Sequence, residues 1–318
     1  MEGWYHSNVL SSIGWTIEKV TPLLDLAVAY KKFIVQKIDV SSKTRLAILT
    51  LFYEPSTRTR LSFEAAAHKL GIRTLTVADA QTSSSAHKGE TLEDMGKIFS
   101  AYGDAVVIRH PDLGAARRFA STATTPVINA GDGAGEHPTQ ALVDIFTIRE
   151  AFGAFKGLCV GLCGDLLNGR TIHSLLRLLV GFGCDIVAIS PPELAIPHDV
   201  LTKIPNGADA IRVEPNLKSA LPHLDVLYMT RVQKERFHDI DVYERVKNAY
   251  KLMRPDLENA SDHLRILHPL PRVDEVAPCV DGDSRALYFT QSANGVPVRM
   301  ALLTAILGLQ NRVHGGLS

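Results

Sequence analysis

Short apolar segments rich in β-branched residues alternate along the chain with longer segments of helical periodicity. The apolar segments predict strands over 46–53, 73–78, 105–109, 126–129, 158–164, 185–190, 208–213, 225–230, 265–268 and 286–290. The helical periodicity predicts helices over 60–70, 91–102, 112–121, 138–152, 170–181 and 296–311. Such alternation is typical of parallel sheets with helices on both faces, since consecutive parallel strands need a crossover connection. The pattern therefore predicts an α/β protein.

A glycine-rich break divides this pattern. The segment 131–135 reads Gly-Asp-Gly-Ala-Gly and is followed by His137 and Pro138, which indicates a boundary. The chain has 318 residues, which suits two domains at about 150 residues each. We therefore expect one domain over 1–135 and a second over 136–293. The last helix is apolar on much of its surface and must pack on something, although periodicity does not say on what.

Polar clusters follow the predicted strands at their carboxyl ends. In the first half these are 56–60, 109–111 and 137–140, and in the second half 165–170, 231–233 and 268–272. Open α/β sheets bind ligands at the carboxyl ends of their strands. We therefore expect the six clusters to serve one cleft between two domains.

The densest cluster is Ser56-Thr57-Arg58-Thr59-Arg60, placed where an apolar strand turns into a helix. A helix N-terminus carries unpaired N–H groups and a partial positive charge, so it suits a phosphate. The alternative is a capped helix start with solvated arginines. Two arginines and three hydroxyls in five residues favour the anion site.

Arg58 of this cluster and three more polar residues of the first half are candidates for the same chemistry. Arg58 and Arg109 would clamp an anion through planar guanidinium groups, unless they form ordinary ion pairs. Lys88, in the polar segment 83–91, would add a further anion contact, and the alternative is a plain surface loop. His137 would donate to a carbonyl oxygen as negative charge develops, although a histidine beside proline often only packs or caps.

In the second half, Arg170 and Arg231 lie on separate loops and could hold both ends of a dicarboxylate. The glycines before Arg170 read G-x-x-G-D-x-x-x-G, which lacks the spacing of a dinucleotide-binding fingerprint. No Ser/His/Asp or Cys/His arrangement is evident, so a covalent intermediate is not expected.

Composition narrows the classes of function. Lys+Arg and Asp+Glu each total 34, so no overall charge favours nucleic acid or an anionic membrane surface. The four cysteines lack zinc or redox spacing and indicate reduced thiols in the cytoplasm. No signal peptide and no apolar run near about 20 residues is present. We expect no metal and no cofactor, because no ligand spacing accompanies the histidines.

Seen together, the motifs resemble the aspartate carbamoyltransferase catalytic chains of the aspartate/ornithine carbamoyltransferase superfamily. The resemblance covers roughly residues 45–310. The motifs that carry it are PSTRTRLSFE (55–64), HKGETL (87–92), RHP (109–111), NAGDG (129–133), HPTQ (137–140), GRTIHSL (169–175), MTRVQKER (229–236) and HPLPRVDE (268–275). The resemblance implies two domains, each a parallel sheet flanked by helices, with the C-terminal segment 294–318 packing back on the first.

The resemblance also implies roles for individual residues. Those binding carbamoyl phosphate would be Ser56, Thr57, Arg58, Thr59, Ser84, Lys88, Arg109, His137, Gln140, Pro269 and Leu270. Of these, the catalytic ones would be Arg58, Thr59, Lys88, Arg109 and His137. Those binding aspartate would be Lys88, Arg170, Arg231, Gln233 and Leu270. Pairs of Glu54 with Arg170 and Arg236 would stabilise the closed cleft.

The implied activity is transfer of a carbamoyl group from carbamoyl phosphate to the α-amino group of L-aspartate in pyrimidine biosynthesis. Ser84 and Lys88 match a loop that the family inserts into the neighbouring subunit's site, which implies a homotrimer. Whether separate regulatory chains or other pyrimidine enzymes join it is left open by the sequence, and residues 1–40 carry no functional assignment.

Three other functions remain alternatives. One is a carbamoyltransferase for another amino acid such as ornithine, against which Arg231 and Pro269 argue. Another is a catalytically silent scaffold, although every matched position is intact. The last is a nucleotide-binding regulator, disfavoured by the absence of a P-loop and of a GxGxxG motif.

Overall fold

The computed structural model describes residues 2–41, 44–80, 89–204, 207–232, 240–246 and 250–309. The chain forms two compact units, Met1–Leu142 with Asn294–Ser318 and Val143–Ala293. The divisions fall inside two helices, α6 (Pro138–Phe152) and α11 (Tyr288–Ile306). Each unit contains one sheet in which every pairing is parallel, as the strand and helix pattern predicts.

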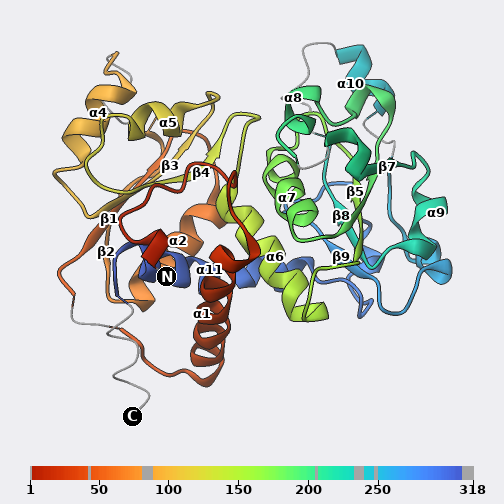
Figure 1. Cartoon of the computed structure of the whole chain (residues 1–318), viewed down its shortest axis with the longest axis horizontal. Helices are drawn as coiled ribbons and strands as arrows, with labels where there is room; N and C mark the ends of the chain where they lie inside the picture. The colour runs from red at the N-terminus through yellow and green to blue at the C-terminus, as the bar shows by residue number, and fades with distance from the viewer. Residues whose placement is uncertain are drawn as a thin grey trace. The chain divides into compact units, whose positions relative to one another are not determined.

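The first unit has a four-stranded sheet of order β2-β1-β3-β4. Its strands are β1 (Ala47–Phe52), β2 (Arg73–Val77), β3 (Ala105–His110) and β4 (Val127–Asp132). Its other elements are η1 (Glu2–Trp4), α1 (Ile17–Gln36), α2 (Thr57–Lys69), α4 (Leu92–Phe99) and α5 (Ala115–Ala120). Figure 1 shows α4 and α5 on one side of this sheet and α1 and α2 on the other.

The end of α11 packs on the first unit, which confirms the expected return of the C-terminal helix. Tyr30 of α1 and Thr304 of α11 share a buried hydrogen bond of 2.7 Å between their hydroxyls. The guanidinium of Arg299 lies 4.9 Å from the ring centre of Phe63 in α2. The N–H of His6 donates to the carbonyl of Ile306. The end of α11 therefore contacts α1, α2 and the N-terminal segment.

The second unit has a five-stranded sheet of order β7-β6-β5-β8-β9. Its strands are β5 (Cys159–Cys163), β6 (Asp185–Ile189), β7 (Ile211–Val213), β8 (Val226–Met229) and β9 (Arg265–Leu267). Its helices are α7 (Arg170–Gly181), α8 (His198–Leu201), α9 (Leu217–Ala220) and α10 (Ile240–Val246), with short turns η3 (Pro192–Leu194), η4 (Gly207–Ala210), η5 (Leu221–His223), η7 (Arg254–Asn259) and η8 (Pro278–Val280). Helices α7 and α9 lie on opposite sides of the sheet in Figure 1.

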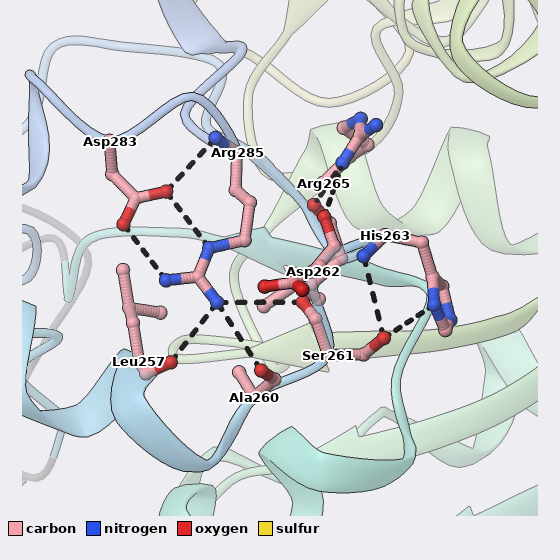
Figure 2. Close-up of polar contacts among 9 residues, drawn as sticks. Leu257, Ala260, Ser261, Asp262, His263, Arg265, Asp283 and Arg285 are labelled. Atoms are coloured by element: carbon pink, nitrogen blue, oxygen red, sulfur yellow. Dashed lines mark hydrogen bonds and ion pairs between the residues drawn. The ribbon is translucent and has the colours of Figure 1, made fainter.

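A branched polar contact fixes the turn that leads into β9. Arg285 grips Asp283 through two hydrogen bonds of 2.8 and 2.9 Å. Its remaining terminal nitrogen, Nη1, donates to the carbonyls of Leu257 (3.0 Å), Ala260 (3.3 Å) and Ser261 (3.5 Å). Figure 2 shows this guanidinium between the carboxylate and the three carbonyls. The carbonyls of Leu257 and Ser261 also accept backbone N–H groups from Ala260 and Leu264, so Arg285 adds a second donor there and joins the end of η7 to Asp283.

Two strands expected from the sequence are wrong in whole or in part, and one helix was not expected. The strand over 286–290 does not form, because Ala286 makes a single isolated bridge to Ile266 and α11 begins at Tyr288. A short apolar run does not distinguish a strand from the first turn of a buried helix. The strand over 208–213 shrinks to β7, since η4 occupies its first half. Helix α1 was not expected, although Val20, Leu23, Leu24, Ala27 and Tyr30 form a fully buried face.

Candidate active site

In the first unit, the expected anion site lies where the order of strands reverses. From β1 the chain continues to β2 on one side, and β3 pairs with β1 on the other. Ligands bind at such switch points, because the loops leaving the two central strands diverge. Phe52 at the end of β1 is in register with Arg109 in β3. The segment 56–59 and Arg109 therefore leave neighbouring strands at the same edge of the sheet.

Helix α2 begins with the hydroxyl and arginine cluster itself. Thr57 is its first residue and Ser56 its N-cap, so the helix starts earlier than the predicted residue 60. The described Ser56 side chain makes no capping hydrogen bond. Arg58 is exposed, whereas Thr59 is buried. The first turn of an α-helix leaves its N–H groups without intrahelical partners. The cluster thus presents backbone donors, an uncommitted hydroxyl and a guanidinium together.

Arg109 forms an ion pair that sequence reasoning missed. Its Nη2 lies 3.3 Å from Oε1 of Glu54, and its Nη1 donates to the carbonyl of Ala130 at 3.4 Å. The Arg109 side chain is 11% exposed, so the guanidinium is held in place. Glu54 was expected in a pair with Arg170, which belongs to the second unit, and that pairing stays a prediction. Here Glu54 fixes an arginine of the anion site.

His137 stands at the start of α6, held by the glycine-rich loop. Oδ1 of Asp132 accepts hydrogen bonds from the N–H of Glu136 (3.0 Å) and the side-chain amide of Asn129 (3.1 Å), while Oδ2 accepts from the N–H of Gly114 (3.0 Å). His137 is 4% exposed. Its carbonyl accepts the N–H of Gln140, and its Nδ1 lies 3.4 Å from the hydroxyl of Thr139. The loop and the backbone of His137 together fix the start of α6.

The neighbouring imidazole is kept neutral. The ring of His110 packs on Tyr53 with centroids 4.8 Å apart. Burial lowers the pKa of His110, and the nearby carboxylate of Asp112 only partly opposes this. Positive charge beside the switch point therefore comes from the arginines and not from this histidine.

The second unit repeats the arrangement with different residues. Its switch point lies between β5 and β8, where Cys163 is in register with Met229. Arg170 is the first residue of α7 after the β5 loop and is 8% exposed. Arg231 follows β8 and is half-buried. The two arginines expected to hold a dicarboxylate thus leave adjacent strands at one edge of the sheet.

The loop after β5 passes against the end of β8. Gly164 has φ +113°, and a Cβ there would lie 2.2 Å from the carbonyl oxygen of Thr230. The buried Asp165 accepts from the N–H (2.9 Å) and the side-chain amide (3.2 Å) of Asn168. Only glycine suits this conformation at such a close approach. The loop is therefore fixed immediately before Arg170.

The loop after β9 is held by His268. Its Nδ1 accepts the N–H of Leu270 at 2.8 Å, so its Nε2 carries the proton and donates to Oε1 of Glu275 at 2.7 Å. Burial raises the pKa of Glu275, but the hydrogen bond from His268 and backbone N–H groups outweigh it, so the pKa is lowered overall. Leu270 has φ +56°, a strained value for a branched side chain. Pro269 and Leu270 thus lie in a loop with a defined backbone.

Four expected site residues, Ser84, Lys88, Gln233 and Arg236, lie outside the described residues. Within the described ranges, no group of three or more histidine, cysteine, aspartate or glutamate side chains could hold a metal ion. Nor is any helix in those ranges long and apolar enough to cross a membrane.

One Ser–His–Asp line exists where none was evident from the sequence. The Ser261 hydroxyl contacts Nδ1 of His263, whose Nε2 lies 2.8 Å from Oδ1 of Asp225. The other oxygen of Asp225 accepts the N–H of Cys159 at 2.7 Å. Figure 2 shows Ser261 and His263 in the turn gripped by Arg285. His263 is exposed and lies just before β9. We therefore assign these Ser–His–Asp contacts to the structure of the turn and not to catalysis.

Two family models match the chain. Residues 7–150 match the carbamoyl-P binding domain of aspartate/ornithine carbamoyltransferase, and residues 156–306 match the Asp/Orn binding domain. The aspartate carbamoyltransferase catalytic subunit of Thermococcus kodakarensis is 44% identical over 306 residues, which cover 96% of this chain and 98% of that one. The catalytic subunit of Halorubrum lacusprofundi is 49% identical over 256 residues, covering 80% of this chain and 81% of the relative.

A solved structure has the same fold. Aspartate transcarbamoylase from Trypanosoma cruzi, in complex with carbamoyl aspartate and phosphate, superposes with a TM-score of 0.91 at 35% identity and covers 96% of this chain and 98% of its own. The same enzyme has also been solved with carbamoyl phosphate and aspartate, with a TM-score of 0.89. Family models over both units and this likeness along the chain agree: the chain belongs to the aspartate/ornithine carbamoyltransferase family.

Proposed function

We propose that this protein transfers the carbamoyl group of carbamoyl phosphate to the α-amino group of L-aspartate, giving N-carbamoyl-L-aspartate and phosphate for pyrimidine biosynthesis. The observation that carries the proposal is a pair of switch-point sites, one suited to a phosphate and one with two arginines for a dicarboxylate. In this proposal residues 1–135 with 294–318 form the carbamoyl-phosphate domain, and residues 136–293 form the aspartate domain, which also contributes His137 and Gln140 to the carbamoyl group.

The phosphate would be held by the first turn of α2. Ser56, Thr57, Arg58 and Thr59 supply hydroxyls, a guanidinium and the N–H groups of the helix start. Ser84 and Lys88 would complete this contact. The helix dipole adds a favourable potential at the same place. Together these groups would stabilise the phosphate as it departs.

The carbamoyl oxygen would be met by Thr59, Arg109 and His137, and the carbamoyl amide by Gln140. Attack by the amine makes a tetrahedral oxyanion, and donors placed for that charge usually provide the largest catalytic effect. Arg109 is already fixed by Glu54, and His137 by the loop before α6. Fixed donors aimed at the oxygen where negative charge develops bind the transition state more tightly than the substrate and need no rearrangement as it forms.

Aspartate would be bound by Arg170, Arg231, Gln233, Lys88 and the backbone at Leu270. Two guanidinium groups at the edge of one sheet match two carboxylates. A second cationic amine, as in ornithine, would be repelled by Arg231. The attacking amine must be neutral, and the departing phosphate is the base that we propose takes its proton. Pairs of Glu54 with Arg170 and Arg236 would then hold the cleft closed and exclude water.

The direct test is release of phosphate from carbamoyl phosphate by the purified chain, with L-aspartate and then L-ornithine as acceptor. We expect release with aspartate and carbamoylaspartate as product. Release only with ornithine or another amine would keep the donor site and overturn the roles of Arg170, Arg231 and Gln233. A folded, trimeric chain that releases no phosphate with any acceptor would favour the silent scaffold or a missing partner chain.

Two substitutions test the donor site, Arg58→Ala and His137→Ala, and Arg60→Ala on the same helix as Arg58 is their control. Arg58→Ala and His137→Ala should each lower turnover by about 10²–10³, the usual loss for one donor to an oxyanion or leaving group. Arg60→Ala removes a guanidinium whose ion pair with Glu64 spans 3.7 Å on the same helix, so we expect turnover within about two-fold of the parent. Near-normal activity of both Arg58→Ala and His137→Ala would contradict the assignment.

We further propose a cytoplasmic homotrimer whose sites are shared between subunits, with Ser84 and Lys88 supplied by the neighbour. The four cysteines are free thiols, which suits a reducing compartment. Mixing inactive Lys88→Ala and Arg58→Ala chains should restore about a quarter of the sites in a closed trimer of randomly mixed chains. No recovery after verified exchange of subunits would exclude shared sites. Regulatory chains or other pyrimidine enzymes as partners would appear as larger complexes on native purification.

A further inference from the structure

A series of buried, hydrogen-bonded polar side chains lies in the second unit, next to the loops proposed to bind aspartate. Its centre is Asp144 of α6, which has no exposed surface. Oδ2 of Asp144 accepts the hydroxyl of Tyr228 at 2.9 Å, and Oδ1 accepts the side-chain amide of Gln291 at 2.7 Å. Tyr228 is fully buried and Gln291 is 1% exposed. A carboxylate in such a place is costly to bury and is retained only with good partners.

One end of the chain reaches the loop after β9. Oε1 of Gln291 accepts the N–H of His268 at 2.8 Å. His268 in turn accepts the N–H of Leu270 and donates to Glu275, whose second oxygen accepts the N–H groups of Val273 and Asp274. The backbone at Leu270 is thus fixed from behind by a side chain of α11.

The other end reaches the start of α7. The hydroxyl of Thr171 hydrogen-bonds Tyr228, and Thr171 follows Arg170 directly. Burial and then the charge of Asp144 raise the pKa of Tyr228 well above its ordinary value, so the phenol remains a donor to Asp144. Geometry fixes donor and acceptor in the three other links, from Tyr228 and Gln291 to Asp144 and from the N–H of His268 to Gln291.

We propose that Tyr228 and Gln291 are positioning residues that hold Arg170 and the Leu270 backbone at a fixed separation for aspartate. The inference rests on the proposed function. It follows from the connection: Thr171–Tyr228–Asp144–Gln291–His268 links the two loops through side chains of α7, β8, α6, α11 and the β9 loop. Hydrogen bonds in a dry interior are stiff and mutually reinforcing, so both loops move together.

The test uses two variants at residues of the hydrogen-bonded series and one at a neighbouring residue outside it. Tyr228→Phe removes one hydroxyl, and Gln291→Met keeps the length of the side chain while removing both of its polar groups. Ile266→Val is the matched control, because it removes one buried methylene from β9 and breaks no link. Each variant is assayed for kcat, the KM for aspartate, the dissociation constant of inorganic phosphate and the midpoint of urea unfolding.

We expect Tyr228→Phe and Gln291→Met each to raise the aspartate KM about ten-fold, the equivalent of one hydrogen bond, with phosphate affinity within about two-fold of the parent. The aspartate KM of the double variant should be no higher than that of Gln291→Met alone, because breaking one hydrogen bond of the series already uncouples the two loops. A purely structural role predicts an unchanged KM, with unfolding midpoints lowered as in Ile266→Val, and that result would overturn the inference. Effects of the two single variants that multiply in the double variant would also overturn it. A parent chain without aspartate-dependent turnover would instead overturn the proposed function itself.

Discussion

In the first unit, the groups suited to a phosphate come from one helix turn and one strand end, with few residues between strand and site. In the second unit, the groups suited to aspartate leave three strands and are held by side chains buried behind them. Both lie at the switch point of a parallel sheet. The comparison teaches that a phosphate site needs little more than a helix start, whereas a two-arginine site needs loops placed accurately against one another.

The largest effect should come from the closest backbone contact of the second unit. Gly164→Ala places a Cβ 2.2 Å from the carbonyl of Thr230 at φ +113°, so the loop must move or unfold. We expect a loss of about 3 kcal/mol or more in the free energy of unfolding, measured by urea titration.

Gly181→Ala is the control for that measurement. It lies at the end of α7 with nothing within 4 Å of the added Cβ, and it should stabilise by up to about 1 kcal/mol. A Gly164→Ala chain that unfolds like the parent would mean that the loops of the second unit adapt, and the comparison between the units would fail.

The fold was predictable because periodicity reports burial directly. The parallel sheets were expected from periodicity, whereas the packing of α11 on the first unit was expected only from the family resemblance. The missed α1 lies in the segment that carried no functional assignment. The strand expected at 286–290 failed because an aromatic run is equally suited to the first turn of a buried helix.

The candidate residues of the two units differed in how much of their arrangement the sequence revealed. Hydroxyls and arginines at the start of α2 are adjacent in the chain, so their chemistry is visible as a motif. The Glu54–Arg109 pair and the chain through Asp144 and Gln291 join residues distant in sequence. A signal did exist, since Asp144 stands alone among apolar residues of a predicted helix. Its partners could be found only in three dimensions.

A matched pair of arginine–carboxylate contacts tests whether the second unit depends more on polar links. Arg285 grips Asp283 and three carbonyls and is largely buried, whereas Arg118 in the first unit grips Glu93 in an exposed position. Arg285→Met should cost about 2 kcal/mol of unfolding free energy, because Asp283 and the carbonyl of Ala260 in Figure 2 lose the guanidinium that donates to them. Arg118→Met should cost clearly less. Equal losses in urea titrations would contradict this difference.

The same contact predicts an acid dependence. The hydrogen bond from Arg285 lowers the pKa of Asp283 to about 2, with burial opposing it. A carboxyl with a depressed pKa stabilises the fold above its unfolded pKa near 4, and that contribution is lost as the pH falls from about 4 to about 2. After screening by solvent we expect about 1 kcal/mol. The measurement is the difference in unfolding free energy between the parent and Arg285→Met. This difference should decrease as the pH falls from about 4 to about 2 and should stay constant above about pH 5.

The smallest effect on stability should come from Ser56, and it separates a ligand site from a cap. Asn216 of the second unit caps α9 by accepting the N–H groups of Lys218 (2.9 Å) and Ser219 (3.2 Å), whereas Ser56 makes no capping bond at the start of α2. Asn216→Ala should therefore cost about 1 kcal/mol, and Ser56→Ala less than about 0.5 kcal/mol. Ser56→Ala should instead weaken the binding of inorganic phosphate several-fold, measured by calorimetry. Equal destabilisation by both substitutions, with phosphate affinity unchanged, would mean that the Ser56 hydroxyl caps α2 and does not bind phosphate. The first unit would then no longer differ from the second in having a helix start that is left open for a ligand.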